Sequence, residues 1–315
     1  MVETLRVENL RVRVGSLEII HGISFDLRPH ERTGLIGESG SGKTLTALAI
    51  MGLLPEGLIA TGSVVYQNSN LLELDERDLC RLRGDRLAMV FQEPMTALNP
   101  VLKIGQQVAE PLRIHRGMRG RDARAAALDN LRRVHLPDPE EKMNAYPHQL
   151  SGGQRQRAMI AMATACSPEV LIADEPTTAL DVTVQAQILQ LLVELVEEEG
   201  ASLLLITHDL PVVATVCQRV LVLYGGYIVE EGDIDFVFGQ PAHPYTRALL
   251  DAIPPLDEEV PDRKLKAIAG SVPNLGEFPP GCPFRNRCPR ADEACSVMPA
   301  TSGDAHRVAC WHPLA

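Results

Sequence analysis

A glycine-rich stretch, GESGSGKT at residues 37–44, constrains this chain more than any other feature. An apolar pattern typical of a buried strand, RTGLIG at 32–37, precedes it, and a helical pattern, KTLTALAIMGLL, follows it. Gly37, Gly40 and Gly42 permit a tight turn whose backbone N–H groups point inward, and a helix N-terminus adds positive dipole. The sequence therefore predicts a phosphate-binding loop between a strand and a helix.

The side chains at the end of this loop indicate a nucleotide with its metal. Lys43 supplies a point charge to the β- and γ-phosphates, and the Thr44 hydroxyl is a ligand for Mg²⁺. The alternative is a glycine-rich turn without function, which the complete motif and its strand–helix context disfavour. We expect ATP to contact the whole loop, namely Gly37, Glu38, Ser39, Gly40, Ser41, Gly42, Lys43 and Thr44.

A pair of acids ends a second apolar strand, VLIADEP at 170–176. Asp174 would lie at the carboxyl end of the sheet, where ligands gather in open α/β folds, and would hold Mg²⁺ through water. Glu175 is then placed to polarise an attacking water as a general base. Alone, the two acids would equally fit a solvated strand end, but beside a phosphate loop they indicate catalysis.

The apolar patterns predict an α/β fold with a mainly parallel core sheet. Alternating apolar and polar residues over the first ~25 positions predict an antiparallel β subdomain before it. Residues 94–165 are rich in Ala, Arg, Leu and Gln, which predicts a helical insertion. An amphipathic helix is expected at 182–199, and further strands at 87–91, 170–174, 203–207 and 219–224.

The composition of the chain changes after about residue 240, where prolines become frequent. At ~150 residues per domain, its 315 residues suggest two domains. We expect a nucleotide-binding domain at 1–240 and a loop-rich C-terminal extension at 241–315. The extension is predicted from its prolines, at positions 241, 244, 254, 255, 261, 273, 279 and 280.

A third motif, LSGGQRQR at 150–157, places two glycines after Ser151 at the predicted start of a helix. One interpretation is an ordinary N-cap. The other is a second anion-binding helix terminus. A second phosphate site would be redundant in a monomer, but it makes sense if it serves a nucleotide held by another chain.

Together, GESGSGKT, FQEP, LSGGQ, LIADEP, TALD and THD resemble, in order and spacing, the ATPase subunits of ABC transporters. The resemblance covers about residues 1–240 and implies an ABC-type P-loop fold. It also implies that Gln92 senses the γ-phosphate, Mg²⁺ or the attacking water, and that His208 reaches the γ-phosphate. Asp181 would lie in a loop between the two sites of a dimer. ATP bound by the opposing subunit would be contacted by Ser151, Gly152, Gly153 and Gln154.

One position departs from the family's pattern. The family places an aromatic ring under the adenine, and the alignment puts Val14 there. Either a nearby side chain substitutes or adenine stacking is weak, at ~1–3 kcal/mol per stacked base.

FQEPMTALNP at 91–100, HPYTRALLDAIP at 243–254 and FPPGCPFRNRCP resemble the oligopeptide, dipeptide and nickel importer branch. This resemblance implies uptake of di- or oligopeptides, driven by ATP, through two separate permease subunits docked near Gln92. It further implies an extracytoplasmic binding protein and a second, related ATPase chain. Alternatives are an importer of nickel, glutathione or another small solute, or a non-transport ABC ATPase.

Four of the seven cysteines, Cys282, Cys288, Cys295 and Cys310, lie in this proline-rich segment. A metal centre could supply the fold there, because little apolar material is available to bury. Four thiolates suit Zn²⁺ or an iron–sulfur cluster, and similar tails in the importer branch are associated with a [4Fe–4S] cluster. One alternative is a zinc ion, with His306 or His312 replacing one thiol, and another is that the thiols are free. A further hypothesis is that the tail is a redox module. The scattered Cys80, Cys166 and Cys217 are interpreted as buried small hydrophobes.

Composition and charge limit the partners and the cellular location of the protein. The formal net charge of −11 argues against nucleic acid as a partner. The apolar runs are strand-length, far short of the ~20 residues of a membrane span. The N-terminus shows no secretory signal. We therefore expect a peripheral protein on the cytoplasmic face of the cell membrane.

Overall fold

The computed structural model describes residues 3–253 and 267–314. Its centre is a seven-stranded sheet with the order β11-β10-β9-β3-β8-β7-β6. The strands from β9 to β6 are parallel, whereas β10 and β11 are antiparallel additions at one edge. The bounds are β3 (Arg32–Ile36), β6 (Leu87–Val90), β7 (Val170–Asp174), β8 (Ser202–Ile206), β9 (Arg219–Tyr224), β10 (Tyr227–Asp233) and β11 (Arg307–Val308). The predicted parallel core is confirmed.

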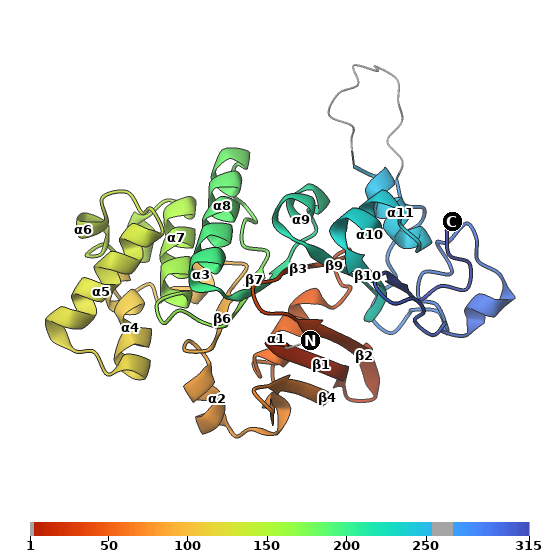
Figure 1. The fold of residues 1–315 in the computed structure, drawn as a ribbon, viewed down its shortest axis with the longest axis horizontal. Helices are drawn as coiled ribbons and strands as arrows, with labels where there is room; N and C mark the ends of the chain where they lie inside the picture. The colour runs from red at the N-terminus through yellow and green to blue at the C-terminus, as the bar shows by residue number, and fades with distance from the viewer. Residues whose placement is uncertain (1–2, 254–266, 315) are drawn as a thin grey trace, which may run out of the picture.

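A second sheet is antiparallel and four-stranded, in the order β2-β1-β4-β5. It consists of β1 (Leu5–Val14), β2 (Leu17–Leu27), β4 (Leu58–Tyr66) and β5 (Ser69–Asn70). Helix α1 (Lys43–Ile50) packs with this sheet against one face of the central sheet, as Figure 1 shows. Strand β1 pairs antiparallel with both β2 and β4, which confirms the predicted antiparallel β subdomain.

Helices cover the other face of the central sheet and extend beyond its β6 edge. The long helix α8 (Val182–Glu199) turns Ile188, Leu192 and Leu195 into the core. Consecutive strand residues point to opposite faces: Leu35, Ile172 and Leu204 join the cluster under α1, and their neighbours join the cluster under α8. The helical insertion comprises α3 (Pro94–Ala97), α4 (Ile104–Arg116), α5 (Gly120–Arg133), α6 (Pro139–Lys142) and α7 (Gly152–Ala163).

The remaining helices are short. They are α2 (Glu76–Leu82), α9 (Leu210–Val216), α10 (Ile234–Gly239) and α11 (Pro244–Asp251), with 3-10 turns at Leu71–Glu73, Pro147–Gln149 and Glu293–Ser296. None of the helices within residues 3–253 and 267–314 combines the length and the apolar character that a membrane span requires. Cys166 and Cys217 are buried as predicted, but the prediction for Cys80 was wrong. Its thiol is exposed on α2 and donates to Glu76, because it lies on the helix face turned to solvent.

The C-terminal extension lies at the opposite end of the molecule from the helical insertion (Figure 1). A buried carboxylate on β10, Glu230, fixes its beginning and its end: Glu230 accepts hydrogen bonds from the backbone N–H groups of Ala242 and His243, and it pairs with His306 at 2.7 Å. After α11, regular structure in the described part of the extension is limited to the short turn at Glu293–Ser296 and β11. Pro254, Pro255 and Pro261, which helped to predict the loop-rich character, lie outside the described residues.

Candidate nucleotide site

The phosphate-binding loop follows β3 and ends at the first turn of α1, as the sequence predicts. Gly37 has φ 154° and Gly42 has φ 105°, backbone conformations that favour glycine. A Cβ on Gly37 would lie 2.1 Å from the carbonyl oxygen of Leu223, and one on Gly42 would lie 2.3 Å from Ile20. These two glycines therefore let the loop approach β9 and β2 closely.

Lys43 is buried at the base of this loop. Its Nζ donates to the carbonyl oxygens of Gly37 and Glu38, at 2.8 and 3.1 Å. Burial lowers the pKa of Lys43, while the carboxylates of Glu175, Asp174 and Glu38 act in the opposite direction. The ammonium is thus held near the loop and close to three acids.

Asp174 ends β7 beside the same loop and is only 2% exposed. The Thr44 hydroxyl donates to its Oδ1 over 3.2 Å. Burial raises the pKa of Asp174, partly opposed by the hydrogen bond from Thr44. A hydroxyl and a carboxylate at this separation form a set of hard oxygen donors, the kind that Mg²⁺ prefers.

Glu175 is the point where several predicted residues meet. Its carboxylate accepts hydrogen bonds from Gln92 at 3.2 Å and from Thr178 at 2.9 Å, and His208 Nδ1 lies 3.2 Å from its other oxygen. Its backbone is left-handed, with φ 44°, which is unusual for a residue other than glycine and is typical of functional sites. Thr178 was not predicted from the sequence, although it lies only three positions after Glu175.

A cavity of about 740 Å³ opens over these groups, within the usual range of ligand pockets. Ser39, Gly40, Gly42, Lys43 and Thr44 line it together with Gln92, Glu175 and His208. The opposite wall was not predicted. It consists of Ile19 from β2 and of Val272, Pro273, Asn274, Leu275 and Phe278 from the C-terminal extension. Nothing in the local sequence of this proline-rich stretch points to a nucleotide site.

The position expected to carry an aromatic ring, Val14, is 40% exposed at the end of β1. Within the described residues, Val14 is not part of the cavity wall, whereas Phe278 is. The ring of Phe278 packs edge-on against Tyr224, with ring centres 6.0 Å apart. An aromatic side chain is therefore present, but the extension supplies it.

The LSGGQ motif starts α7 at the surface. Ser151 and Gln154 form a reciprocal capping box, with the Ser151 hydroxyl accepting from Gln154 N–H and the Gln154 side chain accepting from Ser151 N–H. Ser151 and Gly152 are exposed. In the part of the chain that the structure describes, none of the motif's residues, Ser151, Gly152, Gly153 or Gln154, lines the cavity of its own chain.

Asp181 lies nearby as the N-cap of α8, where its side chain accepts from Val184 N–H at 3.0 Å. It too is exposed. The start of the motif and Asp181 are therefore accessible for contact with another molecule.

The four cysteines of the extension, Cys282, Cys288, Cys295 and Cys310, are free thiols that line a single pocket. Burial raises the pKa of the Cys282 thiol to about 11. It also raises the pKa of Cys288 and of Cys310. His312 also lines this pocket. His306 instead pairs with Glu230 and does not line the pocket. Of the two histidines that the sequence offered as metal ligands, only His312 therefore lies beside the thiols.

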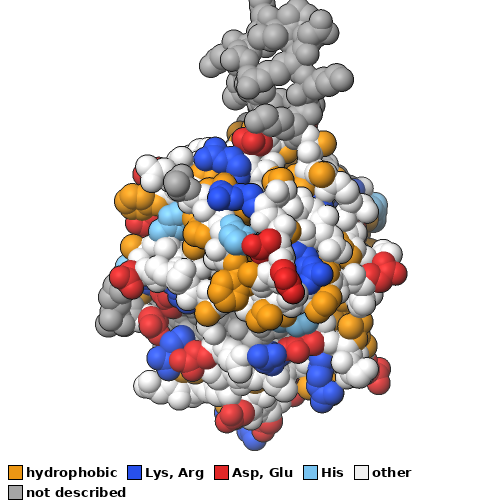
Figure 2. All heavy atoms as spheres, turned by 90° about the vertical axis from the view of Figure 1, so that its right-hand side faces the viewer, with side chains coloured by type: hydrophobic (Ala, Val, Ile, Leu, Met, Phe, Trp, Pro, Cys, Tyr) orange, Lys and Arg blue, Asp and Glu red, His pale blue; other side chains and the backbone are white. Residues whose placement is uncertain are grey.

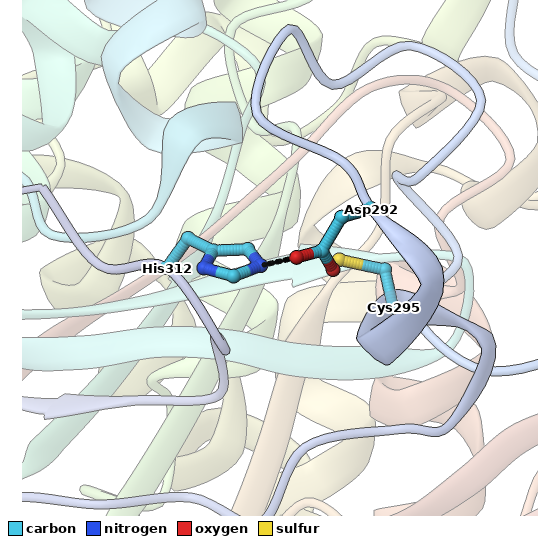
Figure 3. Close-up of side chains that lie close together, drawn as sticks. All are labelled: Asp292, Cys295 and His312. Atoms are coloured by element: carbon cyan, nitrogen blue, oxygen red, sulfur yellow. Dashed lines mark ion pairs between the residues drawn. The ribbon is translucent and has the colours of Figure 1, made fainter.

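Figure 3 shows how His312 lies with respect to one of these thiols. Its Nε2 is 2.9 Å from Asp292, and the ligand atoms of Asp292, Cys295 and His312 all lie within 4.8 Å of one another. Asp292 and Cys295 come from the turn at Glu293–Ser296 and the residue before it. His312, which lines the pocket, is thus paired with Asp292 close to the Cys295 thiol.

His243 is another polar residue that lines the thiol pocket. It is 1% exposed, its Nδ1 accepts from Tyr245 N–H, and burial lowers its pKa to about 3. A neutral imidazole that accepts at Nδ1 carries its hydrogen on Nε2. That Nε2 is buried without a hydrogen-bond partner among the described residues, and His243 lines the thiol pocket. Buried donors are normally paired, so an acceptor is expected there.

The outer face of the extension is seen in Figure 2. Acidic and basic side chains are intermixed on it, with apolar side chains between them, rather than one charge forming a continuous surface (Figure 2).

A triphosphate on the loop would present its γ-phosphate to Asp174 and Glu175, so the fold and this site define a P-loop nucleoside triphosphatase. A family model described as ABC transporter matches residues 20–178, and one described as Oligopeptide/dipeptide transporter, C-terminal region matches residues 229–295.

Individual relatives agree with these two matches. The probable peptide ABC transporter ATP-binding protein y4tR of Sinorhizobium fredii is 50% identical, covering 92% of this chain and 88% of the relative. The oligopeptide transport ATP-binding protein OppD of Salmonella typhimurium is 47% identical, covering 98% and 94%. A dimeric structure of the ATP-binding cassette MJ0796 bound to ADP and Pi superposes with a TM-score of 0.65 at 32% identity, covering 73% of this chain and 98% of that one. The chain therefore belongs to the ABC transporter family, among the ATP-binding subunits of its oligopeptide/dipeptide branch.

Proposed function

We propose that this protein hydrolyses ATP to ADP and phosphate to drive uptake of di- or oligopeptides through separate permease subunits. The observation that carries the proposal is the meeting of Gln92, Thr178 and His208 on the carboxylate of Glu175 beside the phosphate loop. The functions that the names of the relatives give, peptide and oligopeptide transport, support the cargo class. Nickel, glutathione or another small solute is the alternative cargo.

Within the site, Glu175 acts as the general base that takes a proton from the attacking water. His208 and Gln92 hold the Glu175 carboxylate and contact the γ-phosphate side of the nucleotide. Lys43 leaves its two carbonyl partners to bind the β- and γ-phosphates. Phosphoryl transfer needs positioning and charge neutralisation more than covalent chemistry, and each of these groups supplies one or the other.

Mg²⁺ fits this site, because Thr44 and Asp174 present hard oxygen ligands 3.2 Å apart. Gln92 is proposed as a further contributor. The ion would neutralise negative charge on the phosphates.

Two subunits would act together, head to tail. Ser151, Gly152, Gly153 and Gln154 of one chain would contact ATP bound on the other, and Asp181 would lie between the sites. Support comes from the surface position of the motif and from the dimeric relative. The second subunit is proposed to be a different, related ATPase chain.

The nucleobase would lie against the apolar wall formed by Ile19, Leu275 and Phe278. A base presents flat apolar faces, and aromatic or aliphatic side chains stack on such faces. Phe278 would thus replace the ring that is missing at Val14.

Partners and location follow from the proposed importer. Residues 94–165 would dock two membrane-embedded permeases, and an extracytoplasmic binding protein would deliver the cargo. Two exposed apolar side chains that follow Gln92 in the sequence, Met95 and Val101, are suited to such a contact. The protein would then reside peripherally on the cytoplasmic face of the cell membrane, with 1–240 as the nucleotide-binding domain and 241–315 as the extension.

The thiol pocket would hold a metal centre. A [4Fe–4S] cluster needs four thiolate ligands, and four thiols line this one pocket. The unpaired Nε2–H of His243 would donate a hydrogen bond to a sulfur atom of the cluster. Zn²⁺ bound by three thiols and His312 is the alternative. The centre is proposed to have a structural role.

The experiment that tests the site compares Glu175→Gln with Glu198→Gln, an exposed acid on α8. Glu175→Gln should bind Mg-ATP as tightly as the wild type but hydrolyse it at least about a hundredfold more slowly, since the general base is removed. Glu198→Gln should hydrolyse at the wild-type rate. Near-normal hydrolysis by Glu175→Gln would remove Glu175 from this role.

Cargo is tested in cells whose only copy of the chain carries Glu175→Gln. Uptake of a labelled dipeptide should be lost, while nickel and glutathione uptake should continue. Loss of nickel or glutathione uptake with intact dipeptide uptake would contradict the peptide assignment.

A further inference from the structure

The C-terminal extension contacts the phosphate-binding loop through one acidic residue, Glu38, which follows Gly37. Nη1 and Nη2 of Arg287, in the extension, lie 2.6 and 3.1 Å from the two carboxylate oxygens of Glu38. Such two-pronged pairs are stronger and more directional than single hydrogen bonds. The Arg287 side chain is only 6% exposed, so water screens the pair little.

Arg287 is itself fixed on several sides. Its Nε donates to the carbonyl oxygen of Ala269 at 2.9 Å, and its Nη1 also donates to the Tyr224 hydroxyl at 3.2 Å. Its guanidinium carbon lies 5.8 Å from the centre of the Tyr224 ring and 5.9 Å from that of Phe284, which are favourable cation–π distances. The guanidinium therefore meets Glu38 in one defined orientation.

A second group from the extension binds the backbone of the same loop residue. The hydroxyl of Tyr245, on α11, accepts a hydrogen bond from Glu38 N–H at 2.8 Å. Tyr245 is fully buried. Both the main chain and the side chain of Glu38 are consequently tied to the extension.

The Glu38 carboxylate needs this partner for an electrostatic reason. A loop that receives a triphosphate gains nothing from a negative charge, and Asp174 and Glu175 already place two acids near Lys43. In a partly buried site, a further unpaired carboxylate would repel the incoming phosphates more strongly than in bulk water. Arg287 cancels that charge.

We propose that Arg287 is a positioning residue of the nucleotide site, which neutralises Glu38 and holds the phosphate-binding loop in the conformation that accepts a triphosphate. The extension thereby sets the affinity for nucleotide, in addition to any role in contacting partner subunits. This inference rests on the proposed function as an ATP-binding subunit.

The test measures equilibrium binding of Mg-ATP to the full chain. Arg287→Gln should raise Kd about tenfold, because it leaves Glu38 charged and unpaired beside the phosphates. Adding Glu38→Gln to that variant should bring Kd back to within about threefold of the wild type, because the repelling charge is then gone. The Kd of Arg287→Lys should lie between those of the wild type and Arg287→Gln, since lysine keeps the charge but cannot make the two-pronged hydrogen bond.

Rescue by a second substitution separates this role from a merely structural one, which removing Glu38's charge would not repair. Arg285→Gln is the matched control, since Arg285 lies in the same segment and donates to the carbonyl of Pro280; it should bind Mg-ATP like the wild type. A wild-type Kd for Arg287→Gln, or a double variant as weak as Arg287→Gln, overturns the proposal.

Two further variants complete the design. Should Arg287→Gln fail to fold, Arg287→Lys and Glu38→Asp take its place, and a wild-type Kd for both overturns the proposal. Lys43→Ala tests the site itself: it should abolish Mg-ATP binding. Undiminished binding by Lys43→Ala would contradict the ATP site, whereas the Arg287 variants would contradict only the inference drawn from it.

Discussion

The nucleotide-binding core and the C-terminal extension are held together in different ways. In the core, residues of each central strand alternate between two apolar clusters, and backbone hydrogen bonds join one strand to the next. In the described part of the extension, regular structure is sparse. A small group of buried rings attaches it to Tyr224, and a few buried polar side chains add to this attachment. Glu230 binds both of its ends, and Arg287 and Tyr245 bind Glu38.

This difference implies a different tolerance to change. A core built from many similar apolar contacts loses a little with each substitution. An attachment made by a few buried polar groups loses much when one partner is removed, because the remaining groups stay buried and unpaired. Single substitutions of these polar groups should therefore weaken the attachment of the extension while leaving the core intact.

The largest effect is expected from Glu230→Ala. Two backbone N–H groups and His306 would lose their acceptor, at a cost of about 3 kcal/mol or more to the attachment of the extension. Hydrogen exchange should show lost protection at 242–251 and 302–309, with β7 and β8 unchanged. Equal loss of protection in β7 and β8 would show that core and extension are not independent.

A smaller effect is expected from removing one thiol of the pocket. Cys295→Ser should lower the content of iron and sulfide, or of zinc, and should speed proteolysis within 267–314 about tenfold or more, since metal binding contributes folding energy. Cys80→Ser, on the exposed face of α2, is the control and should change neither. Unchanged metal content in Cys295→Ser, or a wild-type protein without metal after anaerobic purification, would contradict the metal centre.

The smallest effect is expected from Phe278→Ala. Stacking on a base is worth ~1–3 kcal/mol, and Ile19 and Leu275 remain in the wall, so the Kd for Mg-ATP should rise only about fivefold. Binding of inorganic tripolyphosphate, which has no base, should not change. Val14→Tyr in the same chain should recover part of the loss, and equal weakening of ATP and tripolyphosphate would exclude a contact with the base.

The sequence was most informative where local pattern and structure coincide. The helix expected at 182–199 is α8, and the strand expected at 170–174 is β7, because apolar periodicity directly reflects which face is buried. The phosphate loop was also predictable, because its glycines and Lys43 all lie within one short motif, at residues 37–44.

Other features could not be predicted because they depend on contacts between distant segments. Phe278 and Leu275 reach the nucleotide cavity only after the extension folds back over the core. The pairing of Arg287 with Glu38 joins residues 249 positions apart. Cys80 was wrongly placed in the core, since a lone cysteine carries no local signal for the face on which it lies.

Strand β11, only two residues long, has a consequence for solubility. It pairs with β10 through Glu230 and Glu231, and Ala309 N–H continues the bonding to Val229. A chain shortened before Arg307 would leave the outer backbone groups of β10 uncovered, and uncovered strand edges can pair with strands from other molecules. The pairing of β11 with β10 should thus protect against aggregation, and truncation before Arg307 should produce oligomers and precipitate before it impairs folding of the central sheet.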